Sequence, residues 1–239
     1  MQNYELKLRF HHKMTEILYF FSTFAHQKMK TIYNKYDKTL IAGLPRVLFS
    51  GRIVVVLTER EAAKAVDYLL SQDLLGVDTE TRPTFRKGPM HHVALLQVSS
   101  REVCFLFRLN QLKLSPSVKR LLEDTTVPKV GLSLTDDLHQ LRRLGDFEPG
   151  SFIELQQRVR EIGVEDMSLQ KLYANFFGEK ISKRQQLTNW EADILTEQQK
   201  GYAATDAWAC LMLYEELMRL ETTNEYELIT IKDEASTVA

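Results

Sequence analysis

Two acidic side chains end an apolar stretch of the sequence, in Gly76-Val77-Asp78-Thr79-Glu80-Thr81. In a strand, successive side chains alternate between the two faces, so Asp78 and Glu80 share one face and Thr79 points to the other. Two carboxylates this close repel each other unless a cation lies between them. Hard oxygen ligands of this kind suit Mg²⁺ or Mn²⁺. A solvated strand end is the simpler interpretation of an isolated Asp-x-Glu, so this pair needs further partners to indicate a metal site.

A second acidic pair, Asp136 and Asp137, follows the short apolar segment 129–132 at the start of a predicted helix. The free N–H groups and the dipole of a helix favour acidic residues at its beginning. One of the two is therefore expected to act only as a cap. Either can supply a carboxylate near the carboxyl edge of the sheet, where α/β folds place their sites.

A third pair, Tyr202 and Asp206, lies inside a long helical stretch. Residues four apart share one helical face, so the Tyr202 hydroxyl and the Asp206 carboxylate can converge on one point. Taken alone, such a pair often does no more than pack and form a hydrogen bond. The alanines at 203 and 204 allow the helix to lie close to a sheet.

The elements that must position these residues alternate between strands and helices. Apolar and β-branched runs predict strands over 52–57, 74–81, 92–98, 103–109 and 129–132. Amphipathic patterns predict helices over 59–70, 115–123, 136–144, 168–177 and 196–220, the last two with N-caps at Ser168 and Thr196. Gly145 suits a left-handed cap after the third of these helices, and residues 152–159 fit either a strand or a loop.

This pattern predicts an α/β fold with a mixed sheet of about five strands flanked by helices. We expect a single domain over 51–221, preceded by a partly disordered N-terminal extension, 1–50, and followed by a loose C-terminal tail, 222–239.

Composition excludes several classes of protein. The 239 residues are 44% hydrophobic and 26% charged, as in ordinary globular proteins, and no apolar run approaches the roughly 18 residues of a bilayer span. A net charge of −1 excludes a polybasic binder, so nucleic acid would have to be held by local patches. Cys104 and Cys210 stand alone, without a C-x-x-C motif, which argues against a disulfide framework or a zinc site and favours a cytoplasmic location.

The order and separation of the acidic motifs match a known family. The sequences that carry the match are Gly-Val-Asp-Thr-Glu-Thr-Arg-Pro at 76–83, Val-Ala-Leu-Leu-Gln-Val at 93–98, Lys-Val-Gly-Leu with Asp137 at 129–137, and Leu-Thr-Glu-Gln-Gln-Lys-Gly-Tyr-Ala-Ala-Thr-Asp-Ala at 195–207. Over roughly residues 50–221, the chain resembles the DEDD exonucleases of the DnaQ-like, ribonuclease H-like superfamily. The resemblance is to the tyrosine subgroup (DEDDy), which contains ribonuclease D and the Werner-syndrome exonuclease domain.

The resemblance assigns the catalytic residues. The first motif of the family falls on Asp78 and Glu80, the second on Asp137, and the third on Tyr202 and Asp206. The histidine subgroup places its base where this chain has Gly201, which favours the tyrosine subgroup. The implied activity is 3′-5′ exonuclease hydrolysis of phosphodiester bonds, with release of 5′-mononucleotides from the 3′ end of DNA or RNA. DNA is favoured, because ribonuclease D carries further helical domains where only 19 residues follow Leu220 here.

The resemblance also implies two Mg²⁺ or Mn²⁺ ions held by the four carboxylates Asp78, Glu80, Asp137 and Asp206. In such a site one ion activates a water and the other stabilises the leaving 3′ oxygen. A tyrosine hydroxyl, with an ordinary pKa of about 10, is a poor base at neutral pH. Tyr202 is therefore expected to orient the attacking water.

Candidate contacts to the nucleic acid are Thr79, Arg82, Lys183 and Arg184, together with Arg86 and Lys87. A solvated charged loop is the alternative for the basic residues among them. Two other functions fit the sequence: a catalytically silent nucleic-acid-binding scaffold of the same fold, and a metal-dependent hydrolase of small phosphate esters. The expected partner is the 3′ end of a nucleic acid, and no membrane is expected to be one.

Overall fold

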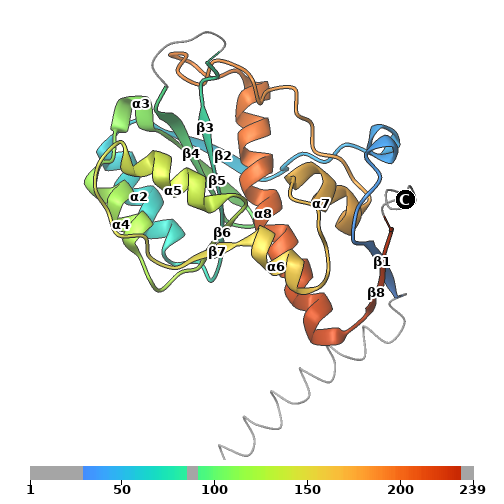
Figure 1. The fold of residues 1–239 in the computed structure, drawn as a ribbon. Helices are drawn as coiled ribbons and strands as arrows, with labels where there is room; N and C mark the ends of the chain where they lie inside the picture. Colours follow the sequence, from blue (N-terminus) through green and yellow to red (C-terminus); the bar gives the residue numbers. More distant parts are fainter. Residues whose placement is uncertain (1–28, 85–90, 233–239) are drawn as a thin grey trace, which may run out of the picture.

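The computed structural model describes residues 29–84 and 91–232, and its centre is a six-stranded mixed sheet of order β2-β5-β4-β3-β6-β7 (Figure 1). Strand β4 runs antiparallel to β3 and β5, and the other neighbouring pairs are parallel. The strands are β2 Arg52–Val56, β3 Leu75–Thr81, β4 Val93–Ser99, β5 Val103–Arg108, β6 Lys129–Gly131 and β7 Phe152–Glu154. The predicted mixed α/β fold is confirmed. The sheet has six strands rather than about five, because Phe152–Glu154 pairs with β6.

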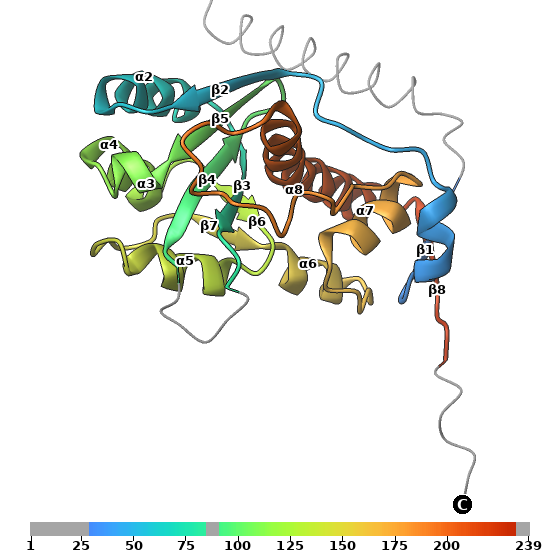
Figure 2. The same cartoon turned by 90° about the horizontal axis from the view of Figure 1, so that it is seen from above.

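Helices cover both faces of the sheet (Figures 1 and 2). One face packs on α2, α4 and α5, and the other packs on α8 with α6 and α7 beside it. The helices are α2 Glu59–Leu69, α3 Leu109–Leu112, α4 Pro116–Glu123, α5 Leu134–Arg142, α6 Leu155–Glu161, α7 Leu169–Phe177 and α8 Glu197–Thr223, with a 3-10 turn, η1, at Lys38–Gly43. None of the helices in the described ranges combines the length and the apolarity needed to span a bilayer.

The predicted N-caps of α7 and α8 are confirmed. The Ser168 hydroxyl accepts a hydrogen bond from the Lys171 amide, and Thr196 forms a reciprocal capping box with Gln199. Because these caps are local in sequence, the pattern of side-chain types was enough to find them.

The limits of α5 differ from the prediction at both ends. The helix begins at Leu134 because the Glu154 carboxylate accepts hydrogen bonds from the amides of Ser133 and Leu134, at 3.1 and 2.7 Å. Ser133 takes the left-handed conformation (φ 64°) that this turn requires. At the other end of the helix the C-cap residue is Arg143, whose backbone has the right-handed helical conformation. Gly145 is not among the glycines with positive φ. The predicted left-handed cap at Gly145 is therefore wrong.

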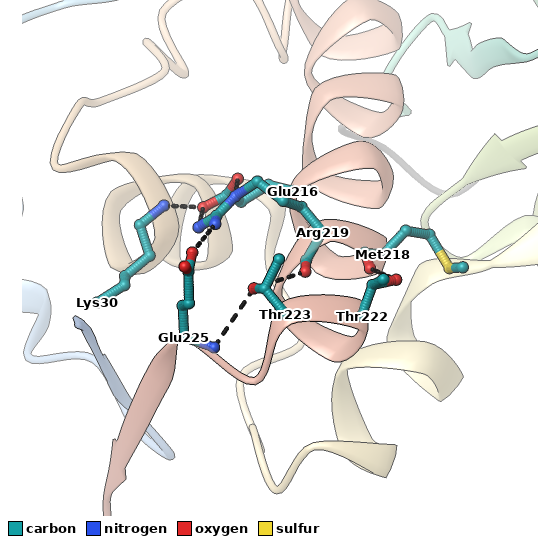
Figure 3. A network of polar contacts seen from close by, with 7 residues as sticks. All are labelled: Lys30, Glu216, Met218, Arg219, Thr222, Thr223 and Glu225. Carbon is teal, nitrogen blue, oxygen red and sulfur yellow. Dashed lines mark hydrogen bonds and ion pairs between the residues drawn. The ribbon is translucent and has the colours of Figure 1, made fainter. Parts of the chain in front are cut away.

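The segments on either side of the predicted domain pair with each other. Strand β1, Lys30–Tyr33, and strand β8, Tyr226–Ile229, form a parallel two-stranded sheet. The expectation of a loose tail over 222–239 therefore does not describe 226–229. Polar contacts fasten both strands to the end of α8, as Figure 3 shows: Glu216 accepts from Lys30 and Arg219, and Arg219 pairs with Glu225 at 2.9 Å.

Helix α8 lies against β3 without room for side chains between the two backbones. A Cβ added to Gly76 would lie 1.9 Å from the carbonyl oxygen of Ala207. Ala203, Ala204 and Ala207 on the same helix are completely buried, and Ala203 and Ala204 pack in one cluster with side chains of β4 and β5. The predicted role of small residues in bringing the helix close to the sheet is therefore confirmed, and this approach sets how near the side chains of β3 and α8 come to each other.

Candidate active site

A cavity of about 320 Å³ opens between the end of β3 and the first turns of α8. Its lining includes side chains from both elements and from the segment that follows α7. Predicted site residues among the lining are Asp78, Thr79, Glu80, Lys183, Tyr202 and Asp206.

Three carboxylates meet at this cavity. Oxygen atoms of Asp78, Glu80 and Asp206 all lie within 4.8 Å of one another. Asp78 and Glu80 share the α8 face of β3, as the alternation of a strand predicts, and Asp206 reaches them from α8. Glu80 and Asp206 are buried and Asp78 is half-buried.

The fourth carboxylate, Asp137, lies beside this cluster. It stands in the first turn of α5, and its Oδ1 accepts a hydrogen bond from the Thr79 hydroxyl at 2.6 Å. Thr79 therefore points away from Asp78 and Glu80, as predicted, and toward Asp137. Asp137 is still near enough for its charge to raise the pKa of Asp78. Its neighbour Asp136 is exposed to solvent, as expected of an acidic residue that acts only as a cap at the start of the helix.

Burial raises the pKa of the carboxyl groups of Asp78, Glu80, Asp137 and Asp206, and repulsion by acidic neighbours adds to the rise for the first three. Burial is the larger cause throughout, followed for Asp78 and Glu80 by the charges of their acidic neighbours. The pKa of Asp78 lies well above its usual value and that of Glu80 rises to about 10. The pKa of Asp206 rises to about 7, and the hydrogen bond from Tyr202 and the charge of Lys183 limit this rise. The pKa of Asp137 rises to about 6, and the hydrogen bond from Thr79 limits that rise. The folded chain thus concentrates carboxylates where their charges are unfavourable without a cation.

Tyr202 stands one helical turn before Asp206 and is buried. Burial first, and then the neighbouring Asp206 and Glu80 charges, raise the pKa of its hydroxyl above the ordinary value of a tyrosine. The ring of Trp190, itself completely buried, packs on Tyr202 with 6.0 Å between ring centroids. Tyr202 is therefore a fixed, protonated hydrogen-bond donor at neutral pH.

The predicted substrate contacts separate into two groups. Lys183 lines the cavity, and Arg184 lines a pocket beside it. Arg82 instead pairs with Glu191 at 3.2 Å, and Glu191 also contacts His91 Nδ1 at 2.9 Å. Arg86 and Lys87 lie outside the described residues.

Gln97 is a buried polar residue beside the site to which the sequence analysis gives no role. It lies directly opposite Asp78 in the β3–β4 pairing, so the two side chains share one face of the sheet. Gln97 is completely buried, yet neither its amide oxygen nor its amide nitrogen has a hydrogen-bond partner. Unsatisfied buried amides are rare because they are costly. The strands β3, β4 and β5 are predicted from the sequence, but Gln97 could be placed opposite Asp78 only if the register between β3 and β4 were known.

The donor set fits a hard divalent cation. All three clustered side chains offer carboxylate oxygens, and Oδ1 of the buried Asp206 has no hydrogen-bond partner. Mg²⁺ and Mn²⁺ prefer such ligands, and a nearby positive charge lowers carboxyl pKa values that burial has raised.

Comparison with known proteins agrees with this geometry. Residues 53–220 match the family model of the 3′-5′ exonuclease domain. The chain belongs to the 3′-5′ exonuclease family. The predicted membership of an exonuclease family, and so of a hydrolase family, is confirmed.

Curated relatives support the assignment. The chain is 33% identical over 191 residues to the mouse bifunctional 3′-5′ exonuclease/ATP-dependent helicase WRN, covering 76% of this chain and 14% of that protein. It is 31% identical over 197 residues to an Arabidopsis thaliana 3′-5′ exonuclease, covering 74% of this chain and 67% of the relative.

Solved structures of exonucleases share the fold. The Aedes aegypti Nibbler EXO domain superposes with a TM-score of 0.66 at 18% identity, covering 74% of this chain and 91% of that domain. Escherichia coli RNase D superposes with a TM-score of 0.63 at 22% identity, covering 73% of this chain and 46% of that one. The predicted ribonuclease H-like exonuclease fold is therefore confirmed.

Proposed function

We propose that this chain is a metal-dependent 3′-5′ exonuclease that removes 5′-mononucleotides from the 3′ end of nucleic acid, with DNA favoured over RNA. The observation that carries the proposal is the meeting of Asp78, Glu80 and Asp206 within 4.8 Å beside a cavity, on a fold that belongs to the exonuclease family. The predicted cytoplasmic location and the domain limits 51–221 stay predictions.

The residues that hold the proposed Mg²⁺ or Mn²⁺ ions are Asp78, Glu80 and Asp206, with Asp137 as the fourth ligand of a two-ion site. When bound, the cations supply Lewis acidity and neutralise the negative charge that develops on the phosphate and the leaving oxygen. The Thr79 hydroxyl holds Asp137 in place by its 2.6 Å hydrogen bond.

The reaction is a displacement at phosphorus. A water oxygen forms a bond to the last phosphorus of the strand, and the bond from that phosphorus to the 3′ oxygen of the preceding nucleotide breaks. The released nucleotide keeps the 5′ phosphate, and the shortened strand ends in a 3′ hydroxyl. The raised pKa of Tyr202 keeps its hydroxyl protonated, so its role is to orient the water by a hydrogen bond rather than to remove a proton.

The size of the cavity supports action at an end of the strand. Its volume of about 320 Å³ is at the lower limit of small-molecule sites, which suits one terminal nucleotide better than an internal stretch of duplex. Lys183 at its rim supplies a positive charge for the entering backbone.

The test is the length of the products from 5′-labelled DNA and RNA strands in Mg²⁺ or Mn²⁺. The expected result is a ladder that shortens from the 3′ end, with 5′-mononucleotides released and all hydrolysis stopped by EDTA. Asp137→Asn is expected to lower the rate by roughly 100-fold, because one ligand loses its charge. The adjacent, exposed Asp136→Asn is the matched control and keeps the wild-type rate.

Other outcomes would support the alternatives. Binding of the strand without any release of nucleotides would favour a catalytically silent scaffold. A larger kcat/KM on a nitrophenyl thymidine phosphate than on every oligonucleotide would favour a hydrolase of small phosphate esters.

A further inference from the structure

A second pocket, of about 300 Å³, adjoins the acidic cavity and is basic. Cationic side chains from two distant parts of the sequence line it, namely Arg46, Lys180, Lys183 and Arg184. The two hollows are neighbours that share part of their lining, namely Gln170, Ile181, Ser182 and Lys183.

Backbone pairing fixes the walls of this basic pocket. Arg46 and Lys180 form a parallel β-bridge. The Val47 amide donates to the Lys180 carbonyl at 3.1 Å, and the Lys180 amide donates to the Pro45 carbonyl at 2.8 Å. The Lys180 ammonium also donates to the carbonyl of Ala42. Arg46 and Lys180 therefore stand at defined positions on a paired backbone.

The arginines of the basic pocket are not balanced by acidic partners. No carboxylate lines the pocket, and within the described ranges 29–84 and 91–232 neither Arg46 nor Arg184 takes part in an ion pair. Lys183 also borders the acidic cavity, where its charge lowers the pKa of Asp206. A concave site with several uncompensated cations attracts anions, although the whole chain has a net charge of −1.

We propose that the basic pocket binds a backbone phosphate of the substrate strand on the 5′ side of the bond that is cut. This inference rests on the proposed function. At a 3′ end, the terminal nucleotide fills the acidic cavity, and every other phosphate of that strand lies on its 5′ side. The strand therefore has to leave the cavity past groups that tolerate phosphate, and the adjoining basic pocket supplies them. Lys183, which borders both hollows, stands between the two phosphates.

Through Arg46, the segment that precedes the family domain takes part in binding the strand. Arg46 precedes residue 53, where the match to the exonuclease family begins. Strand β1, earlier in the same segment, is fastened to α8 through the contacts of Lys30 and Glu216 (Figure 3). A phosphate contact of this kind positions the strand without reading its bases.

The first test is the salt dependence of binding, measured by anisotropy of a 5′-labelled single strand in EDTA, where hydrolysis does not interfere. For the double variant Arg46→Gln/Arg184→Gln we expect about tenfold weaker binding and a log Kd against log salt slope that is smaller by about 0.7, the value for one phosphate contact on a single strand. Arg60→Gln, an exposed arginine on α2 at the opposite side of the molecule, is the matched control and keeps the wild-type slope.

The second test compares substrates of different length. A dinucleotide carries only the phosphate that is cut, whereas a trinucleotide adds one phosphate on its 5′ side. We expect the wild-type chain and Arg60→Gln to have a larger kcat/KM on the trinucleotide, and the double variant to lose that preference. If no substrate is hydrolysed but the salt slope changes as expected, the proposed function fails and the phosphate site stands.

The proposal is overturned if the double variant keeps both the wild-type Kd and the wild-type slope. It is also overturned if inorganic phosphate binds the wild-type chain and is lost in the double variant while binding of the strand is unchanged, because the pocket would then be a site for free phosphate. The unfolding midpoint of each variant shows whether it folds. Should the double variant fail to fold, the single variants Arg46→Gln and Arg184→Gln are compared in the same two tests, each with half of the effect expected.

Discussion

At the scale of single residues, Thr79 connects the acidic cluster on β3 to the helix beside it. Its hydroxyl donates to Asp137, and this hydrogen bond opposes the rise that burial causes in the pKa of that carboxyl group. The alternation along β3 therefore sends Asp78 and Glu80 to one side and uses Thr79 on the other side to hold the fourth carboxylate. The expected contact of Thr79 with substrate stays a prediction, because Thr79 also lines the cavity, and its hydrogen bond to Asp137 gives its side chain a positioning role as well.

A substitution at Thr79 tests this role. Thr79→Val keeps the shape and removes the donor, so we expect roughly tenfold losses in both Mn²⁺ affinity and the rate of nucleotide release, the usual scale for outer-shell partners of ligands. Thr79→Ser, which keeps the hydroxyl, is expected to restore both quantities. Equal Mn²⁺ affinities for the valine variant and the wild-type chain, measured by calorimetry, would show that the hydroxyl does not position Asp137.

At the scale of elements, the distance between α8 and β3 decides whether Asp206 reaches Asp78. Gly76 permits that distance, since a Cβ there would lie 1.9 Å from the Ala207 carbonyl oxygen. Gly76→Ala is expected to force the helix outward, to destabilise the fold by roughly 3 kcal/mol and to lower the rate of hydrolysis.

Gly201 is the matched control for Gly76. It lies inside α8, and a Cβ there would meet no atom within 4 Å. Gly201→Ala is therefore expected to stabilise the fold by about 0.5–1 kcal/mol through helix propensity. Unfolding in urea measures both variants. If Gly76→Ala is as stable as the wild-type chain, the close approach of β3 and α8 does not constrain the site.

Features set by neighbours in the sequence were predictable, and features set by distant partners were not. The pairs Asp78 with Glu80 and Tyr202 with Asp206 follow from the periods of a strand and a helix, and the N-cap at Thr196 follows from residue types. The start of α5 depends instead on the carboxylate of Glu154, which lies in β7, about 20 residues further along the chain.

Strand register and pairing between distant segments account for the other differences between the predicted and the observed structure. The three-residue strand β7 exists because it pairs with β6, and β8 exists because it pairs with β1. The position of Gln97 opposite Asp78 is a matter of register, which the sequence pattern does not specify. The basic pocket needs Arg46 beside Lys180, and only the folded chain brings these two together.

At the scale of the whole molecule, the acidic cluster makes folding depend on pH. The pKa values of Asp137 and Asp206 in the folded chain are raised to about 6 and about 7, whereas unfolded aspartates titrate near 4. Between these limits the folded chain binds more protons than the unfolded chain. Its free energy of unfolding therefore falls as pH rises.

We expect thermal unfolding in EDTA to show a lower midpoint at about pH 8 than at about pH 5, with Asp206 alone contributing on the order of 2–3 kcal/mol. Asp206→Asn, which cannot ionise, is expected to flatten this dependence. Addition of Mn²⁺ at the higher pH is expected to raise the midpoint of the wild-type chain, because ligands that bind only the folded state stabilise it. A midpoint in EDTA that rises from pH 5 to pH 8 would show that the carboxyl groups of the cluster do not have raised pKa values in the folded chain.

A calorimetric titration of the metal-free chain with Mn²⁺ at neutral pH tests whether the clustered carboxylates bind cations. We expect saturable binding of two ions, strong loss of binding in Asp78→Asn and Asp206→Asn, and wild-type binding in Asp136→Asn. An absence of saturable binding, or the same binding in Asp206→Asn as in the wild-type chain, would show that these carboxylates do not form a cation site.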